Sequence, residues 1–257
     1  MSAKPRIRRF GLALRLALLI ITVTSLIFAA AFGYNYQQTK ALLLKNVENS
    51  AKSLTQATVS KIEEALHGLQ TLPDTVAQGY GSRALDRSQS LVMLADFLRD
   101  NREAYGAGLF LEEHAQEGSA RREAPYFVKK NGRVTYDPMG EEYAYGFMDW
   151  YMLPKHLARA EWSEPYYDEA GGNILMATYA APVWTEMDGE KLFSGVVTVD
   201  ISLESLQTMV ASLHPNISGY AFLVSRTGRM VSHPNRALIM RSSVFSRAEE
   251  ADDPDLR

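Results

Sequence analysis

The stretch that decides the fold is GNILMATYAAPVWTEMDGEKLFSGVVTVDIS, from Gly172 to Ser202. It contains two runs rich in Val, Tyr, Phe and Thr, which are residues that favour β-strands. The turn-forming pair Asp188 and Gly189 separates the two runs. The pattern predicts two antiparallel strands joined by a tight turn.

Neighbouring segments extend this pattern. YGAGLFLEE (105–113) and APYFVKKNGRVTYD (124–137) have the same strand-forming composition, and KNGR within the second is a hairpin signal. Apolar residues recur at helical spacing in residues 87–104 and again in LESLQTMVASL (203–213). Helices and an antiparallel sheet in one chain predict an α+β fold.

A long helix is predicted ahead of the sheet. Residues 34–72 contain no proline, one glycine, and a stripe of apolar or small residues at spacings of three and four. TLPD (71–74) is expected to end the helix, because proline disfavours helix in the residue before it. The stripe is expected to dock on the following domain, and a partner helix from a second subunit is a further possibility.

The N-terminus carries a membrane-targeting pattern. Lys4, Arg6, Arg8, Arg9 and Arg15 precede an uncharged run from Leu16 to Phe32. With its flanks, residues 11–33, the run reaches the length of about 20 residues that a spanning helix needs, and the basic tail 1–10 is expected in the cytoplasm. The alternative is a signal peptide cleaved after Ala29–Ala31. Under both interpretations the residues that follow are exported from the cytoplasm.

A second domain is expected to begin near residue 213. GYAFLVSRTGRMVSHP (219–234) predicts a strand, a turn and a strand, but the polar residues that follow are too few to complete a sheet. The predicted domains are therefore 73–212 and an incomplete 213–257. We expect the sequence to be the front portion of a longer protein, with a second membrane span beyond it.

Composition excludes several functions. The chain has no cysteine, so it has no disulfides, thiolate zinc sites or cysteine nucleophiles. Its net charge of −3 gives no reason to expect nucleic acid as a partner. None of its five histidines has metal-ligand spacing, and no nucleotide-binding or hydrolase motif occurs. An enzyme and a cofactor are not predicted, although an exported hydrolase with an unrecognised site is a competing interpretation.

A binding function is better supported by DWYMLPKHLARAEWSEPYYDEAGG, residues 149–172. All three tryptophans of the chain lie within 35 residues of one another, with carboxylates nearby. Aromatic rings and a carboxylate together suit a cation such as an alkylammonium. Core packing is the ordinary alternative for each aromatic residue taken singly. The candidate site residues in and around this segment are Asp149, Trp150, Tyr151, Trp162, Tyr166, Asp168 and Asp200, and the family resemblance described below adds Tyr143.

The motifs in order resemble the double Cache family of extracytoplasmic sensor domains in bacterial membrane receptors. The resemblance covers about residues 34–257 and rests on DWYMLP, WSEPYYD, ATYAAPV, GVVTVDIS and GYAFLVSRTGRMVSHP. It implies a PAS-like antiparallel sheet in residues 73–212, which would be the membrane-distal, ligand-binding module. It also implies a homodimer in the bacterial inner membrane and an output module beyond residue 257.

The resemblance also implies where a ligand binds. In amino-acid-binding members a tyrosine, an arginine, a Trp-Tyr pair and two aspartates shape the pocket, and Tyr143, Trp150, Tyr151, Asp168 and Asp200 match all but the arginine. The arginine position is Met148, which has neither the charge nor the donors to hold a carboxylate.

The expected ligand is therefore an amine or quaternary ammonium compound, with an amino acid as the next choice. Alternatively, Lys155 or Arg159 replaces the arginine, and the ligand carries a carboxylate. A further alternative is a structural ectodomain that dimerises and binds no ligand. The sensor interpretation requires Asp168 and Asp200 to face each other across an aromatic-lined hollow.

Overall fold

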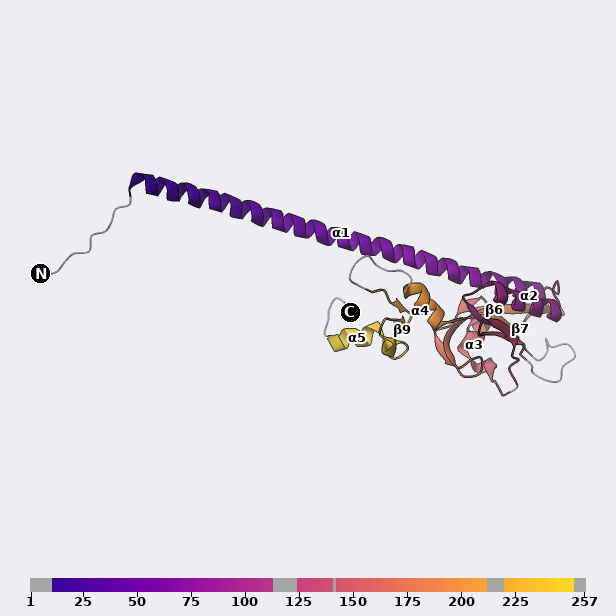
Figure 1. Ribbon diagram of the computed structural model, residues 1–257. Helices are drawn as coiled ribbons and strands as arrows, with labels where there is room; N and C mark the ends of the chain where they lie inside the picture. The colour runs from indigo at the N-terminus through magenta and orange to yellow at the C-terminus, as the bar shows by residue number, and fades with distance from the viewer. Residues whose placement is uncertain (1–10, 113–123, 141, 212–219, 252–257) are drawn as a thin grey trace. The chain divides into compact units, whose positions relative to one another are not determined.

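The computed structural model describes residues 11–112, 124–140, 142–211 and 220–251, so the basic tail 1–10 lies outside the described residues (Figure 1). The chain divides into two compact units, Met1–Gln56 and Ala57–Arg257. The described part of the first unit is helical from Leu12 onward, and its residues are exposed from position 11 to position 50.

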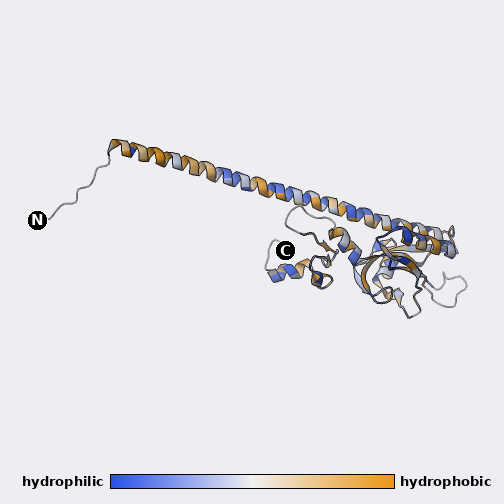
Figure 2. Ribbon diagram, in the orientation of Figure 1, coloured by the Kyte–Doolittle hydropathy of each residue, from blue (hydrophilic) through white to orange (hydrophobic). Residues whose placement is uncertain are grey.

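Helix α1 (Leu12–Gly81) carries the apolar run in its first part, which is coloured orange in Figure 2. Large apolar side chains of this run are exposed, such as Leu19 at 61% and Phe28 at 63%. Apolar side chains on all sides of a helix are favourable in a bilayer core and unfavourable in water. Within the described part of the chain, α1 is the one helix that is long and apolar enough to cross a membrane, and a signal sequence has the same properties.

The predicted end of the long helix at Thr71–Asp74 is wrong, because α1 continues to Gly81. Pro73 lies inside the helix, where it has no N–H to donate to the carbonyl of Leu69, at a cost of about 3 kcal/mol. Burial offsets this cost: Leu69 is 1% exposed and Val76 is 0% exposed where they pack in the core. Tertiary packing therefore overrides the local effect of the proline.

The Ala57–Arg257 unit is built on a seven-stranded antiparallel sheet. Its strands are β1 (Ala104–Leu111), β2 (Tyr126–Lys130), β3 (Arg133–Tyr136), β4 (Glu161–Trp162), β5 (Tyr166–Asp168), β6 (Ile174–Met187) and β7 (Glu190–Ser202). Their spatial order is β3-β2-β1-β7-β6-β4, and β5 also pairs with β6. The predicted hairpins form as β6–β7 and β2–β3, the latter through Asn131 and Gly132 with φ of 54° and 75°. The α+β class is confirmed.

Alternate residues of each strand point to opposite faces of the sheet, and each face carries its own apolar cluster. One face packs against the later part of α1 and against α2 (Arg87–Asp100), with Tyr179 and Leu94 in the same cluster. The other face packs against η2 (Tyr145–Phe147) and α3 (Asp149–Leu157), with Phe110 and Trp150 in the same cluster. In Figure 1, α2 and α3 lie on either side of β6 and β7.

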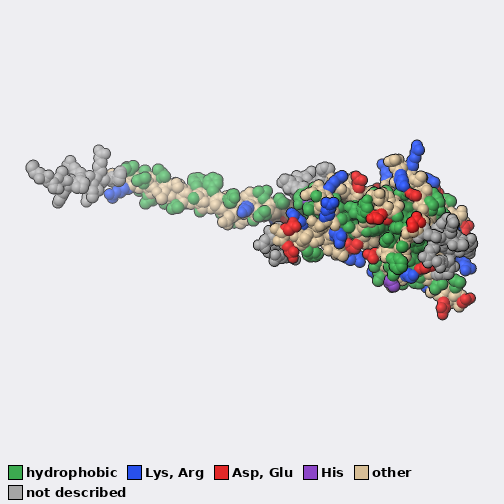
Figure 3. Space-filling view, turned by 90° about the horizontal axis from the view of Figure 1, so that it is seen from below, with side chains coloured by type: hydrophobic (Ala, Val, Ile, Leu, Met, Phe, Trp, Pro, Cys, Tyr) green, Lys and Arg blue, Asp and Glu red, His purple; other side chains and the backbone are tan. Residues whose placement is uncertain are grey.

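The chain leaves the sheet through α4 (Leu203–Ala211). Beyond it are β8 (Leu223–Val224), β9 (Met230–Ser232), η3 (Arg236–Leu238) and α5 (Val244–Ala251). The strands β8 and β9 form a two-stranded sheet, whose turn contacts the first sheet through Arg226 and Glu161 at 3.2 Å. On the face of this unit that Figure 3 shows, basic and acidic side chains are intermixed. A domain boundary near residue 213 stays a prediction.

Candidate functional site

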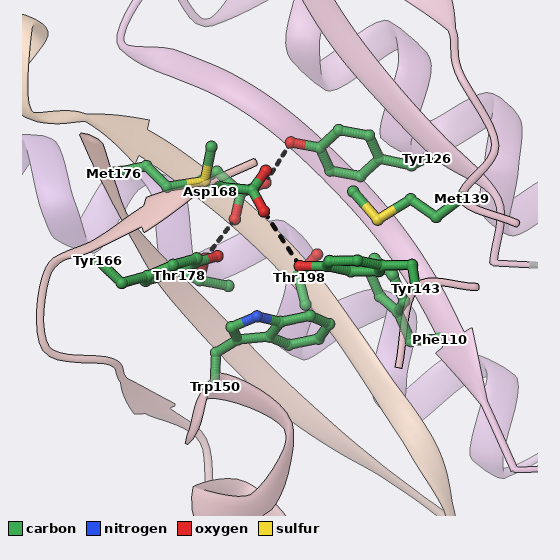
Figure 4. A pocket seen from close by; sticks show the side chains of 11 residues that line it. Phe110, Tyr126, Met139, Tyr143, Trp150, Tyr166, Asp168, Met176, Thr178 and Thr198 are labelled. Carbon is green, nitrogen blue, oxygen red and sulfur yellow. Dashed lines mark hydrogen bonds between the residues drawn. The ribbon is translucent and has the colours of Figure 1, made fainter. Parts of the chain in front are cut away.

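A cavity lies between the sheet and the segments that cover its α3 face (Figure 4). Five of the eight candidate residues line it: Tyr143, Trp150, Tyr166, Asp168 and Asp200. The other residues that line it are Phe110, Tyr126, Met139, Met176, Thr178 and Thr198. The free space between these side chains is about 10 Å³, which is room for about one water molecule.

Strand geometry explains why these residues meet. Thr178 of β6 pairs directly with Asp200 of β7, so their side chains lie on the same face of the sheet. Thr198 lies two residues before Asp200 on the same strand and therefore points to the same face. Trp150 reaches the cavity from the first turn of α3.

Asp200 is one of the two buried charged groups of the site. It is 3% exposed, and its carboxylate accepts hydrogen bonds from Tyr126 at 2.7 Å and from Thr178 at 2.6 Å. The pKa of Asp200 is raised to about 6, mainly by burial and also by the negative charge of Asp168, while the hydrogen bonds from Thr178 and Tyr126 partly oppose the shift.

Asp168 is the second buried carboxylate, and it is also 3% exposed. It accepts a hydrogen bond from the Tyr143 hydroxyl at 3.1 Å and one from the backbone N–H of Gly171 at 2.5 Å. A Cβ atom at Gly171 would lie 2.3 Å from Oδ2 of Asp168, so the close approach of this turn requires glycine. Asp168 thus connects the segment before η2 to the turn between β5 and β6.

The tyrosines of the cavity act as hydrogen-bond donors. Burial, with the charges of the two aspartates, raises the pKa values of Tyr126, Tyr143 and Tyr166 above their ordinary range. Tyr166 and Thr178 are 2.8 Å apart, and Thr178 gives its one hydroxyl proton to Asp200. Tyr166 is therefore the donor in this pair, and the three residues form a directed chain that ends on a carboxylate.

The cavity combines negative charge with aromatic walls. Among the described residues that line it there is no lysine, arginine or histidine. The rings of Phe110 and Trp150 meet edge to face with centroids 4.7 Å apart, and Tyr143 covers the cavity in Figure 4. Within the described ranges, no three acidic or histidine side chains converge as metal ligands. Two carboxylates inside aromatic walls are suited to an organic cation.

The structure does not bring three candidate residues to the cavity. Asp149 is exposed at the first residue of α3. Tyr151 is buried, with its ring 5.6 Å from that of Phe193. Residues 149 to 151 project about 100° apart around a helix, so they cannot all reach one hollow. Trp162 pairs with Tyr179 of β6 and packs against its ring at 5.3 Å, on the face that α1 covers.

The basic residues that might have replaced the missing arginine make other contacts. Lys155 forms an ion pair with Glu112 at 2.6 Å and lies 5.0 Å from the centre of the Phe193 ring. Arg159 pairs with Glu161 at 2.9 Å. Neither lines the cavity, and Met148 packs at the edge of its apolar cluster.

Sequence reasoning missed the residues that depend on strand pairing. Thr198 was accessible from the sequence, because it stands two residues before Asp200 in a predicted strand. Thr178 and Tyr126 were not, because their place opposite Asp200 follows from the register of β6 and from the position of β2 in the sheet.

Comparison with known proteins identifies the kind of domain that contains the sheet. Residues 91–208 match the profile of the first PDC sensor domain of methyl-accepting chemotaxis protein-like proteins. The chain is 26% identical over 225 residues to the methyl-accepting chemotaxis protein McpA of Pseudomonas putida, covering 86% of this chain and 31% of McpA. The chain thus spans about a third of the length of that relative.

Solved structures have the same architecture. The extracellular domain of mmHK1S-Z3, described as a histidine kinase, matches with a TM-score of 0.62 and 27% identity over 80% of this chain and 78% of that chain. The ligand-binding domain of the Pseudomonas aeruginosa amino-acid chemoreceptor PctC, in complex with GABA, matches with a TM-score of 0.58 and 24% identity. The second match covers 79% of this chain and 83% of that chain, and it supports the fold alone.

Proposed function

Because this chain belongs to the Cache (PDC) family of extracytoplasmic sensor domains, we propose that it senses a small ammonium compound for a bacterial transmembrane receptor. The family consists of ligand-binding sensor domains and not of enzymes. One observation carries the choice of ligand: Asp168 and Asp200 are both 3% exposed, and no basic side chain of the described ranges lines the cavity they share.

The energetics favour a cation. A buried carboxylate without a positive partner is costly, and here two of them share one low-polarity cavity. A charge-assisted hydrogen bond from an ammonium group to an aspartate contributes about 1.5 to 3 kcal/mol. Contact of the cation with the faces of Trp150 and Tyr143 adds roughly 0.5 to 2 kcal/mol for each ring. A ligand with one positive charge thus reduces the cost of burying the two carboxylates, which is the largest unfavourable contribution at this site.

A carboxylate ligand is less favourable in this cavity. It would add a third negative charge beside Asp168 and Asp200, and Met148 stands at the position where the family resemblance implies an arginine. Lys155 and Arg159 are paired with Glu112 and Glu161. GABA, the ligand of PctC, contains both an ammonium and a carboxylate group, and only its ammonium half has matching partners here.

A structural ectodomain that binds no ligand is the competing proposal. It expects the aspartates to be exposed at the surface, whereas both are buried against aromatic rings. The small volume of the cavity favours this competitor, because a ligand larger than water has to displace side chains. Met139 and Tyr143 belong to the segment before η2, and we propose that this segment moves when the ligand enters.

The signal is proposed to leave the site through β6. Thr178 contacts Asp200 inside the cavity, and the next residue, Tyr179, donates hydrogen bonds to the carboxylate of Asp74 in α1 at 3.0 and 3.1 Å. A displacement of β6 is thereby transmitted to α1. A ligand shifts this equilibrium only by its difference in affinity for the two positions.

The membrane arrangement completes the proposal. Residues 1–10 are cytoplasmic, 11–33 span the inner membrane, and the sensor lies in the periplasm. The part of α1 that follows the span forms a stalk that pairs in a homodimer, the sheet domain up to residue 212 is the membrane-distal module, and residues 213–257 begin a membrane-proximal one. A second span and an output module follow beyond residue 257. The apolar first part of α1 supports the span, and the McpA relationship supports the receptor role.

A titration of the full chain in detergent tests the ligand class. Ethylammonium, tetramethylammonium, acetate and glycine are added while the melting temperature is followed, and a ligand at 100 times its Kd stabilises by about 2.7 kcal/mol. The matched variants are Asp200→Asn in the cavity and Asp149→Asn on the surface. Stabilisation by the ammonium compounds that is lost in the first variant alone supports the proposal. Stabilisation by acetate alone, or by none of the four, contradicts it.

A further inference from the structure

Two polar groups that line the cavity have no hydrogen-bond partner. They are the indole N–H of Trp150 and the hydroxyl of Thr198, in side chains that are 4% and 1% exposed. The indole N–H approaches the Tyr143 hydroxyl closely enough to lower its pKa, but it makes no hydrogen bond of normal geometry. Buried polar groups without partners are uncommon in folded proteins and call for a specific explanation.

The rest of the cavity shows how unusual these two groups are. Asp168 and Asp200 each accept two hydrogen bonds, and Tyr126, Tyr166 and Thr178 all have partners. Figure 4 shows Trp150 and Thr198 bordering the same space, with the nitrogen-bearing edge of the indole directed toward it. The site therefore has unused hydrogen-bonding capacity on one side and its negative charge on the other.

The two unpaired groups, the Trp150 N–H and the Thr198 hydroxyl, indicate which chemical group of a ligand could bind them. An indole N–H only donates, so its partner must be an acceptor, while a threonine hydroxyl can donate as well. A carboxylate as this acceptor would stand beside two buried aspartates, and no basic residue in the part of the chain that the structure describes lines the cavity. A neutral oxygen, as in an alcohol, ether or carbonyl, satisfies both groups without adding charge.

We propose that the ligand carries a neutral oxygen acceptor beside its ammonium group, and that Trp150 and Thr198 recognise this oxygen. The inference rests on the proposed function, because it concerns the same cavity and assumes a cationic ligand. It narrows the ligand from ammonium compounds in general to amino alcohols and related oxygen-bearing amines. Thr198 is then a specificity-determining residue that contributes little to the fold.

The test compares ethanolamine with n-propylamine, which have the same charge and nearly the same shape and differ in one hydroxyl group. Binding to the full chain in detergent is measured by calorimetry. We expect ethanolamine to bind about tenfold more tightly, which corresponds to about 1.4 kcal/mol, because its oxygen forms two hydrogen bonds that n-propylamine lacks. In Thr198→Val and Trp150→Phe the preference falls, while n-propylamine affinity in Thr198→Val stays within about twofold.

Trp162→Phe is the matched control for the indole. Trp162 also has a buried N–H without a partner, but it lies on the opposite face of the sheet. This variant should retain the preference for ethanolamine. The ligand-free melting temperature separates recognition from folding: Thr198→Val should leave it unchanged or raise it by about 2 to 4 °C, since the variant removes a buried unpaired hydroxyl.

The outcomes are distinct. Equal binding of the two amines to the unmodified chain overturns this inference and leaves the proposed function standing. A preference that persists in Thr198→Val and Trp150→Phe also overturns it. Failure of both amines to bind overturns the proposed function and the inference together. A preference lost in both cavity variants and kept in Trp162→Phe supports the assignment.

Discussion

The hydroxyl of Thr178 donates a 2.6 Å hydrogen bond to Asp200, directly across the β6–β7 pair. This contact joins the buried charge of the site to a strand whose next residue, Tyr179, contacts α1. The cavity and α1 are thus connected through two consecutive residues of one strand. A change at Asp200 on one face of the sheet can therefore reach α1 on the other face through Thr178 and Tyr179 of β6.

Asp200→Asn is expected to weaken ammonium binding by about 10- to 100-fold, because one charge-assisted hydrogen bond contributes about 1.5 to 3 kcal/mol. The ligand-free protein should not be destabilised strongly, since the change removes a buried charge. Calorimetry and thermal unfolding measure the two effects. Asp149→Asn, at the exposed start of α3, is the control and should bind normally.

Ligand affinity should depend on pH through Asp200, whose pKa is raised from 3.8 to about 6. Below pH 6 the carboxyl is protonated and loses its attraction for an ammonium group, so affinity should fall up to about tenfold per pH unit and level off above pH 7. Titrations between pH 5 and 8 measure this slope. Asp200→Asn should abolish it, and an unchanged slope in that variant would assign the titration to another group.

The same shift predicts the stability of the ligand-free protein. The folded state holds the Asp200 proton more tightly than the unfolded state, so it binds more protons between pH 3.8 and 6. The contribution of this group to the free energy of unfolding is therefore largest below pH 3.8 and is lost as the pH rises to 6. Subtracting the pH profile of Asp200→Asn from that of the unmodified chain isolates the effect, and a difference of opposite sign contradicts it.

Tyr179→Phe should separate ligand binding from the contact with α1. The variant removes the hydroxyl that donates to Asp74, while the cavity on the other face keeps all its residues. We expect ligand affinity within about twofold of normal and a loss of stability of about 1 kcal/mol. Hydrogen exchange in residues 69–77 should become faster and less sensitive to the ligand. Retained ligand protection of α1 in this variant would show that Tyr179 does not transmit the change.

Gly171→Ala should disrupt the site, because the added methyl group clashes with the side chain of Asp168. Its Cβ would lie 2.3 Å from Oδ2 of Asp168, so the turn or the carboxylate has to move, at a cost of about 1 to 3 kcal/mol. Ammonium binding and the melting temperature should both fall. Gly146→Ala is the matched control, because no atom lies within 4 Å of a Cβ at that position. Equal effects of the two substitutions would contradict the prediction that a clash with Asp168 causes the loss at position 171.

The sequence by itself determined the elements of this protein and the chemistry of its site. Alternating and helical spacings predicted the β6–β7 hairpin, α2 and α4, because these patterns depend only on neighbours along the chain. Asp168 and Asp200 were predicted as site residues from the aromatic and acidic segments around them and from the family resemblance. The resemblance also implied that Met148 stands where an arginine is expected.

Only the tertiary structure decided which residues meet. Strand register placed Thr178 opposite Asp200 and put Trp162 opposite Tyr179, on the face away from the cavity. Rotation along α3 directed Trp150 inward while Asp149 stayed exposed. Packing against the sheet carried α1 past Pro73 to Gly81. Strand pairing and burial depend on contacts between residues that are far apart in the sequence. Local sequence patterns therefore do not predict them.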